Sequence, residues 1–381
     1  MDLRDLGRSN RRQILRCILK SGGLSRSDIA RETGLAHSTV TEITYQLVQR
    51  GILSTREIRR SGARGRPSIV LSLNPRESLV VVADYSDLAA MAHLADPAGE
   101  ILETRSLALP RSPTLKQYVA AEARLVASVA RGRWDKVQGV TIVGPGVVDP
   151  QSGRLLQNSH FGWGPGSFVK PFSRFGKQTF LQNGSRLRAM AENWYGAAQD
   201  LENFLFFHLG QGIGGAIVLD GLLVAGPSHG AGEFGHVMAD PKGPSCSCGG
   251  KGCLEAVASI PAIVRQLAAE ECPDFAAAWN LYEAGNRSAR AVFRKACLLI
   301  ARSIFNAVVS VGPTTVVVGG EMVEASNGGI LALVDESLRE HRSFFEKISL
   351  RRCRLPENRS QVAGAVLHAL QELDIERPRT P

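Results

Sequence analysis

The spacing of apolar residues over the first fifty positions predicts three short helices. Residues 11–19 carry apolar side chains at helical intervals, and the Gly22-Gly23 pair ends this helix. A second helix starts at Ser25, an N-cap residue with an acidic residue three positions further on, and ends at Gly34. A third helix covers residues 37–50. Because a tight turn joins the second and third helices, the pattern predicts a helix-turn-helix.

The third helix has one apolar face and one face of small polar residues. Its apolar stripe consists of Val40, Ile43, Leu47 and Val48. The positions that we expect on the opposite face are Ser38, Thr39, Thr41, Glu42 and Thr44. Short hydroxyl side chains near the start of a recognition helix reach base edges and phosphates without filling the major groove. We therefore expect DNA contacts from Ser38, Thr39, Thr41 and Glu42, although an ordinary helical hairpin would give the same two helices.

The segment after the third helix has the pattern of a strand, a basic loop and a second strand. Apolar stretches at residues 52–53 and 69–71 flank the basic residues 56–66, as in the wing of a winged helix-turn-helix domain. The Gly-Arg-Pro core of the loop resembles segments that place arginine in a narrow A·T-rich minor groove. A solvated linker between domains is the alternative. We expect DNA contacts from Arg59, Arg60, Arg64 and Arg66.

The distribution of charge favours a nucleic-acid partner. The chain has 381 residues and a formal net charge of +9. Residues 1–75 hold 14 lysines and arginines against 6 acidic residues, whereas the remainder holds 31 against 30. A basic surface kept for solubility would be spread along the chain, but neutralisation of phosphates requires a local one. With 44% hydrophobic residues, the chain is also too apolar to be disordered.

Further along the chain the pattern changes to that of an α/β protein. A meander of three apolar strands, of the kind that opens actin-like ATPase lobes, is predicted at residues 79–83, 88–94 and 100–107. A second series of strands begins near residue 203, around the glycine-rich run 210–215. We therefore predict a winged helix-turn-helix at residues 1–75 and a two-lobed domain at residues 76–381. A cleft between the two lobes would bind a ligand.

Four potential metal ligands occur close together in the second half of the chain. They are His236, Cys246, Cys248 and Cys253. Three thiolates and one imidazole suit tetrahedral Zn²⁺ and leave no position for a catalytic water, so we expect a structural zinc ion. Free cysteines in a loop are the alternative. The odd total of seven cysteines argues against a disulfide framework and indicates a reducing compartment.

No membrane segment is expected. The uncharged run at residues 303–320 is interrupted by the Gly312-Pro313 pair, which divides it into the end of a helix and a buried strand. The first residues of the chain, Met1 to Asp5, contain no apolar signal segment. We expect a cytoplasmic protein.

These residues carry a resemblance to a known family. The runs E-F-G-H at 233–236, C-S-C at 246–248 and C-L-E at 253–255 are similar to the zinc signature of the ROK family (repressors, open reading frames and kinases). The resemblance implies a sugar-kinase domain of the actin-like ATPase (ribonuclease H-like) fold, with a zinc loop that holds one wall of the sugar site. The positions that it assigns to sugar binding are Asn158, Asn183, Glu233, His236 and Glu255.

Two parts of the family's kinase chemistry are missing from this chain. ROK kinases carry a first phosphate loop of the form D-x-G-G-T-K, whereas the matching residues here, 84–89, read D-Y-S-D-L-A. The family's catalytic Asp follows an Asn, but in this chain Gly184 follows Asn183. Glycine cannot accept a proton, and loss of a positioned base typically costs about 10²- to 10⁴-fold in rate. We therefore expect no catalytic residues.

Two functions remain open on this basis. The first is a sugar-responsive transcriptional regulator, expected to repress carbohydrate uptake or catabolism genes, in which an inactive kinase domain senses the ligand. The second is an ATP-dependent ROK sugar kinase with an appended DNA-binding domain. A DNA-binding architectural protein without a ligand would leave the sugar-site residues unexplained.

The expected DNA target predicts that the protein is an oligomer. One winged helix makes few base contacts, so we predict a homodimer or a dimer of dimers on a palindromic, A·T-rich double-stranded operator. The long apolar helix at residues 289–311 could supply either core or dimer surface. Sugar binding would close the cleft and change the placement of the DNA-binding domains.

Overall fold

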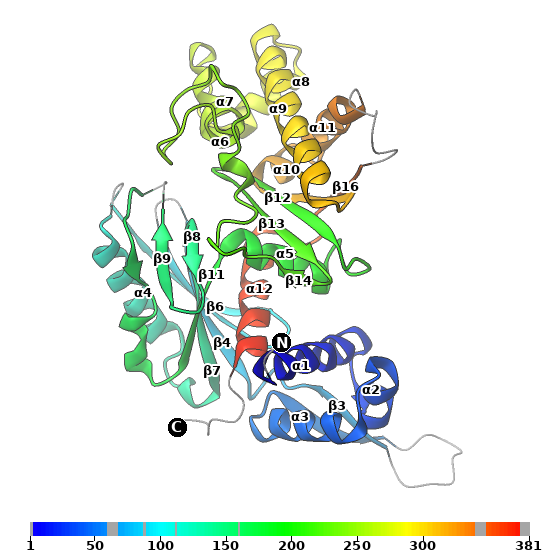
Figure 1. The fold of residues 1–381 in the computed structure, drawn as a ribbon. Coiled ribbons are helices and arrows are strands. Elements are labelled where there is room, and N and C mark those ends of the chain that lie inside the picture. Colours follow the sequence, from blue (N-terminus) through cyan, green and yellow to red (C-terminus); the bar gives the residue numbers. More distant parts are fainter. Residues whose placement is uncertain are drawn as a thin grey trace.

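The chain folds into a small N-terminal domain and two larger lobes (Figure 1). The structure is a computed structural model that describes residues 3–58, 68–86, 89–110, 113–158, 161–339 and 348–373. Each lobe is built around a five-stranded sheet. Two helices, α5 (Gly184–Tyr195) and α12 (Glu357–Glu372), lie between the two sheets. The predicted α/β architecture is confirmed.

The N-terminal domain is a winged helix-turn-helix. Its helices are α1 (Leu3–Ser21), α2 (Arg26–Thr33) and α3 (His37–Gln49). Its strands are β1 (Leu24–Ser25), β2 (Leu53–Ile58) and β3 (Ser68–Leu73), and they form a sheet in the order β1-β3-β2. Apolar residues of the three helices and the wing strands pack into one core, which includes Ile14, Ile29, Val40, Leu47 and Leu71.

Local signals predicted the ends of α2 correctly. The Ser25 side chain accepts a hydrogen bond from the backbone N–H of Asp28, and Gly34 has the left-handed φ of 70° that favours glycine at a C-cap. The expectation for Thr44 was wrong, because its hydroxyl is buried and accepts a hydrogen bond of 2.8 Å from Arg26 Nε. Val48, in turn, is only half-buried. The loop with Arg59, Arg60, Arg64 and Arg66 lies outside the described residues.

The first lobe contains a sheet in the order β11-β7-β4-β5-β6. Its strands are β4 (Leu79–Ser86), β5 (Ala89–Ala95), β6 (Ile101–Ala108), β7 (Val137–Gly144) and β11 (Gln178–Asn183). Val81 of β4 packs with helix α4 (Leu115–Val129), whereas Val80 and Val82 pack with α12, because successive strand side chains point to opposite faces. A small sheet of three strands adjoins this lobe: β8 (Val147–Asp149), β9 (Arg154–Gln157) and β10 (Gly166–Ser167).

The second lobe contains a sheet in the order β14-β13-β12-β15-β16 and a cap of helices. Its strands are β12 (Phe204–Leu209), β13 (Ile213–Leu219), β14 (Leu222–Leu223), β15 (Thr315–Gly319) and β16 (Ser349–Arg352). Its helices are α6 (Leu254–Ala258), α7 (Ile260–Gln266), α8 (Phe275–Glu283), α9 (Arg287–Val311), α10 (Glu321–Ala325) and α11 (Gly329–Arg339). Short 3₁₀ segments occur at Trp134–Lys136, Lys170–Phe175, Phe234–His236 and Ala268–Glu270.

The long helix α9 lies with its apolar face in the core of the second lobe. Phe293, Ile300 and Ile304 are fully buried there, so this face serves the core rather than a dimer surface. None of the helices in the described part of the chain has the length and apolar character needed to cross a membrane.

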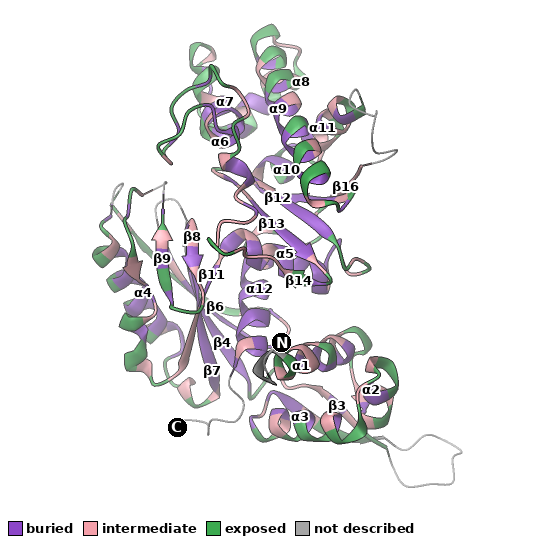
Figure 2. Ribbon diagram, viewed as in Figure 1, coloured by how far each residue is buried: buried purple, intermediate pink, exposed green. Residues whose placement is uncertain are grey.

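Helix α12 is almost entirely buried and connects distant parts of the molecule (Figure 2). Its first turn, with Glu357 and Gln361, lies at the cleft between the lobes. Its last residues contact the N-terminal domain, where Arg8 pairs with Glu372 at 3.1 Å and Arg11 donates to the carbonyl of Leu373. The cleft and the N-terminal domain therefore share one helix.

Candidate functional site

A cleft of about 860 Å³ lies between the two lobes. Strand ends of both sheets and the first turns of α5, α10 and α12 form its walls. The structure brings to this cleft all five residues that the sequence assigned to sugar binding: Asn158, Asn183, Glu233, His236 and Glu255. The size and the polar lining suit a ligand with several hydroxyl groups.

Two carboxylates from the second lobe form one wall of the cleft. Glu255 Oε2 accepts a hydrogen bond of 2.9 Å from the backbone N–H of Ile213, which fixes the orientation of its carboxylate. The Glu233 carboxylate makes no hydrogen bond with another described residue, and burial raises its pKa, although His236 and Arg186 oppose this shift. Glu233 is therefore the acceptor most available to ligand hydroxyls.

The two asparagines lie on the opposite side and have structural roles as well. Asn183 is the N-cap of α5, where its Oδ1 accepts from the N–H groups of Ser185 and Arg186 at 2.9 and 3.2 Å. Its Nδ2 also donates to the carbonyl of Gly146. Asn158 Oδ1 accepts from the N–H of Phe161. These bonds hold both amides in place and leave part of each facing the cleft.

The four predicted metal ligands meet at one point beside this cleft. The ligand atoms of His236, Cys246, Cys248 and Cys253 all lie within 4.8 Å of one another. The Sγ atoms of Cys248 and Cys253 are 3.6 Å apart, as are Cys246 Sγ and His236 Nδ1. Ligands of a tetrahedral Zn²⁺ with Zn–S bonds of about 2.3 Å would be roughly 3.8 Å apart, so the set fits this ion. His236 also lines the cleft, and the loop that holds these four residues is thereby joined to the wall that contains Glu233 and Glu255.

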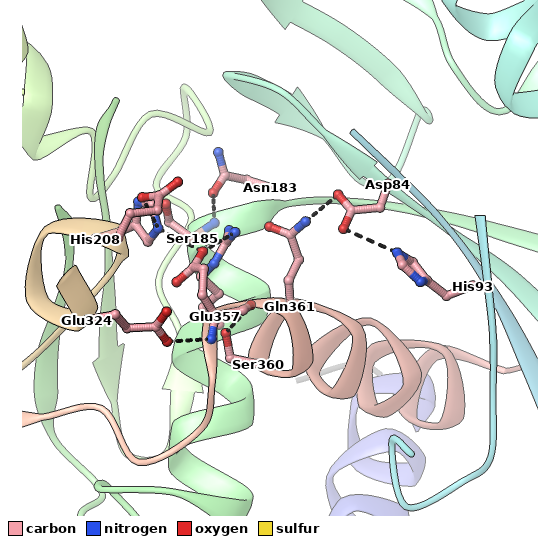
Figure 3. Close-up of polar contacts among 11 residues, drawn as sticks. Asp84, His93, Asn183, Ser185, His208, Glu324, Glu357, Ser360 and Gln361 are labelled. Atoms are coloured by element: carbon pink, nitrogen blue, oxygen red, sulfur yellow. Dashed lines mark hydrogen bonds and ion pairs between the residues drawn. The ribbon is translucent and has the colours of Figure 1, made fainter. Parts of the chain in front are cut away.

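The space beside Gly184 is filled by two other side chains. A Cβ atom on Gly184 would lie 2.7 Å from Gln361 Oε1 and 3.0 Å from an Arg188 nitrogen. Gln361 in turn donates a hydrogen bond to Asp84 at the end of β4 (Figure 3). The other side of Asp84 faces His93, whose Nε2 is 3.8 Å away. Residues 87 and 88 of the expected phosphate loop lie outside the described residues.

A second polar network lies where the first turn of α12 meets the cleft. Glu357 pairs with Arg188 at 2.5 Å and with His208 Nε2 at 2.9 Å. Its own backbone N–H donates to Glu324 at 2.8 Å, as Figure 3 shows. Burial would raise the pKa of Glu357, but His208 and Arg188 outweigh it and lower the pKa to about 2. This network ties α5, β12 and α12 together.

The lining of the cleft is strongly acidic. Among the described residues that line it, one carries a guanidinium, Arg188, and six carry carboxylates: Asp84, Glu233, Glu255, Glu321, Glu324 and Glu357. The Glu321 carboxylate also packs against Gly210, at the start of the glycine-rich turn that resembles a phosphate loop. Because like charges repel most strongly where water is excluded, this lining disfavours a triphosphate.

The DNA contacts predicted for the N-terminal domain fall on the exposed face of α3. Ser38, Thr41 and Glu42 are exposed as predicted, and Thr39 is half-buried at the edge of the face. The sequence interpretation missed Tyr45, which is 59% exposed on the same face. Its spacing of three and four residues from Glu42 and Thr41 could have identified it.

Helix α1 contacts both lobes through arginines. Arg8 and Arg11 bind the end of α12, and Arg16 donates to the carbonyl of Gln199 in the second lobe at 3.1 Å. Arg12 lies close to Gly221 of the same lobe. Burial and the nearby Arg16 lower the pKa of Arg12 to about 10. A movement of one lobe relative to the other would therefore be transmitted to α1.

Comparison with known proteins gives two family matches. The ROK family matches residues 87–370, and a winged helix-turn-helix DNA-binding family matches residues 8–54. The chain is similar to the DNA-binding transcriptional dual regulator NagC of Escherichia coli, with 29% identity over 264 residues that cover 68% of this chain and 64% of NagC. A glucokinase of Thermotoga maritima is 32% identical over 204 residues, or 49% of this chain and 64% of the glucokinase.

Among solved structures, one regulator matches nearly the whole chain. It is described as a ROK family transcriptional regulator, homolog of the E. coli MLC protein, and has a TM-score of 0.82 and 22% identity. The match covers 97% of this chain and 98% of that one and shows a common fold. The chain spans just under two thirds of the length of NagC and of this glucokinase.

Proposed function

Because the chain belongs to the ROK family and carries an N-terminal winged helix-turn-helix, we propose that it is a DNA-binding transcriptional regulator whose activity responds to a sugar. The observation that carries the proposal is the combination of an exposed polar face on α3 with a cleft that gathers the five predicted sugar-binding residues and has Gly184 at the expected position of the catalytic base. Relatives named as N-acetylglucosamine and xylose repressors support repression of carbohydrate genes as the physiological role. Such a regulator would act in the cytoplasm, where the DNA is.

The cleft supports sensing rather than phosphotransfer. A kinase of this type needs a carboxylate that accepts the proton of the substrate hydroxyl and a site for the triphosphate. Here Gly184 stands at the position of the base, and Gln361 and Arg188 occupy the space beside it. The only guanidinium among the described lining residues, Arg188, is already paired with Glu357. We therefore propose that the protein has lost kinase activity.

The same charges define the class of effector. A phosphorylated sugar would bring a dianion into a cleft lined by six carboxylates. An unphosphorylated sugar would instead offer hydroxyl donors to Glu233 and Glu255, whose oxygens are acceptors. Asn158 and Asn183 would contact the other side of the ring. We propose an unphosphorylated sugar as the effector.

A structural zinc ion would support this wall. The ligands would be His236, Cys246, Cys248 and Cys253, and their close approach fits tetrahedral coordination. Bound zinc would supply no catalytic chemistry, because the four protein ligands complete its coordination. Its role would be to hold the loop that carries Glu233 and Glu255.

Coupling between sugar and DNA would run through α12 and α1. When a sugar closes the cleft, the second lobe moves relative to the first, and α12 packs mainly on the first. Arg16 would move with the second lobe because it is hydrogen-bonded to Gln199, whereas Arg8 would move with α12 because it is paired with Glu372. Helix α1 would then shift, and the winged helix with it. The sugar can change DNA affinity only by its different affinity for the two arrangements, typically by about 1 to 3 kcal/mol.

The DNA target would be a palindromic, A·T-rich operator bound by a homodimer or a dimer of dimers. Contacts from Ser38, Thr39, Thr41 and Glu42 would lie in the major groove, and contacts from Arg59, Arg60, Arg64 and Arg66 in the minor groove. Two such domains, one helical turn or a multiple apart, would supply the affinity that one lacks.

The test is a selection of genomic DNA fragments by the purified chain at a stated salt concentration. Recovery of a few fragments that share a palindrome supports the regulator, and genes beside them indicate which sugars to titrate. If only non-specific DNA is recovered with and without sugars, the regulator proposal fails. ATP-dependent phosphorylation of sugars would then test the kinase alternative, which the similarity to a glucokinase favours.

A further inference from the structure

Tyr45 is an aromatic residue on the outside of the proposed recognition helix that no part of the fold uses. It lies in the third turn of α3 with 59% of its surface exposed. Within the described residues it has no ring contact, hydrogen bond or ion pair. Its neighbours Thr44 and Gln46, in contrast, bond to Arg26 at 2.8 Å and to Glu42 at 3.2 Å.

The packing of α3 fixes the direction in which Tyr45 points. Val40 and Leu47 are fully buried in the core of the domain, on the side of the helix opposite Tyr45. The Arg26–Thr44 hydrogen bond holds α3 against α2, and the carbonyl of Arg50 accepts a bond of 3.0 Å from Gln138 of the first lobe. Rotation of α3 to bury Tyr45 would break these interactions. Figure 2 shows the solvent side of α3 as exposed.

Tyr45 shares its face with the residues proposed to bind DNA. Ser38, Thr41, Glu42, Tyr45 and Gln49 are all exposed, and their spacings of three and four residues place them along one side of the helix. Tyr45 is the largest of them and the only aromatic one. In a recognition helix set into the major groove, this position would face the floor of the groove.

The chemistry around Tyr45 favours a base contact over a phosphate contact. Glu42, one turn earlier, carries a negative charge that repels phosphate oxygens. The Tyr45 hydroxyl is a donor that can reach phosphate oxygens, but its ring can pack against the 5-methyl group of thymine, which only the major groove presents. Tyr45 thus has no internal partner and has the position and the chemistry needed to recognise a base.

We propose that Tyr45 determines operator sequence by packing its ring against a thymine methyl group in each half-site. This inference rests on the proposed DNA-binding function and adds to it the base that one residue recognises. The methyl contact requires the ring of Tyr45 but not its hydroxyl group.

The experiment compares the full-length chain with Tyr45→Phe and Tyr45→Ala in selections from randomised DNA duplexes. We expect the wild type and Tyr45→Phe to select the same thymine in each half-site, and Tyr45→Ala to lose preference at that position alone. Replacement of this thymine by deoxyuridine, which lacks the methyl group, should weaken wild-type binding about fourfold per site, as removal of one buried methyl group implies. Tyr45→Ala should bind both duplexes equally.

The outcomes separate this inference from the function on which it rests. If the wild type selects no shared sequence, the regulator proposal fails, and the role of Tyr45 fails with it. If the wild type selects a palindrome and Tyr45→Ala selects the same one with the same response to deoxyuridine, Tyr45 does not read the base. A decrease in affinity that is equal for all sequences would identify a backbone contact and also overturn the inference. Because Tyr45 is exposed, the thermal unfolding of Tyr45→Ala should match that of the wild type.

Discussion

Gln361 donates a hydrogen bond to Asp84 across a sequence separation of 277 residues. The bond joins the first turn of α12 to the end of β4 at the floor of the cleft. Gln361 also packs beside Gly184, where the family's kinases have their base. One glutamine therefore lies beside the position of the expected base and bonds to Asp84, the first residue of the segment that matches the first phosphate loop.

Restoring the carboxylate at position 184 should not restore a kinase. In Gly184→Asp the new Cβ would lie within 3.0 Å of Gln361 and Arg188 atoms, so these side chains must move. Because both atoms are the ends of flexible side chains that can shift at small cost, we expect little change in the unfolding free energy, and no ATP-dependent phosphorylation. Chemical denaturation measures the unfolding free energy, and a sugar-phosphorylation screen measures the kinase activity. Phosphorylation by this variant would show that the missing base alone disables the enzyme.

Glu357 should make stability depend on pH in the acid range. Its pKa is lowered from 4.5 to about 2 in the folded state, so its stabilising effect is present above pH 4.5 and is lost as the pH falls toward 2. A shift of this size corresponds to about 3 kcal/mol. We expect the unfolding free energy of Glu357→Gln to be lower than that of the wild type at pH 7. The two values should converge near pH 2.

Glu77→Gln is the matched control for that measurement. Glu77 pairs with Lys136 at 3.0 Å, but its side chain is 51% exposed, and exposed pairs contribute little. Unfolding free energies across pH 2 to 7 should therefore stay close to those of the wild type. If Glu357→Gln behaves like Glu77→Gln, the network at Glu357 does not stabilise the fold.

Removal of one thiol should remove the metal and the response to sugar together. We expect Cys246→Ser to lose most of its zinc and to show no response to sugar, because the metal-binding loop supports the wall of the cleft that contains Glu233. Elemental analysis and sugar titrations measure the two effects. Cys272→Ser, at a buried thiol outside the cluster, should keep both. One zinc ion per chain in Cys246→Ser would contradict the four-ligand assignment.

Arg16 should transmit the sugar signal without contributing to DNA contact. Arg16→Ala removes the hydrogen bond between α1 and the carbonyl of Gln199. We expect operator affinity without sugar to change little and the sugar-dependent change to shrink severalfold. Arg31→Ala, which removes an exposed pair with Asp28 inside the DNA-binding domain, should leave the response intact. Equal sugar responses in the wild type and Arg16→Ala would exclude the route through α1.

The arginines of the wing should contribute to the salt dependence of binding. Replacement of Arg64 and Arg66 by alanine is expected to weaken operator binding and to flatten the slope of log affinity against log salt by about 0.9 for each phosphate that is no longer neutralised. Titrations at several salt concentrations measure the slope. An unchanged slope would show that neither residue binds the DNA.

Signals that act over a few residues predicted much of this fold. The cap at Ser25, the positive φ at Gly34 and the apolar run that predicted β4 all depend on neighbours in sequence, and the structure agrees with them. The metal cluster was also predictable, because its four ligands occur within 18 residues. The zinc itself, the sugar contacts and the domain boundaries remain predictions.

Contacts between distant residues could not be predicted from the pattern. Thr44 was expected on the polar face of its helix. Its hydroxyl oxygen instead accepts a hydrogen bond from Arg26, which makes its burial favourable. The Gln361–Asp84 bond and the arginines that hold α1 depend on how three sheets and two helices assemble. Composition and periodicity contain no information about such pairs.

The anchoring of α1 also orders events during synthesis. Arg11 and its acceptor, Leu373, are 362 residues apart, so the DNA-binding domain leaves the ribosome long before its anchor is made. A nascent or prematurely terminated chain would carry a winged helix without the anchor that joins it to the cleft through α12. On the proposed mechanism, only a polypeptide that already includes α12 can place its DNA-binding domain under the control of a ligand.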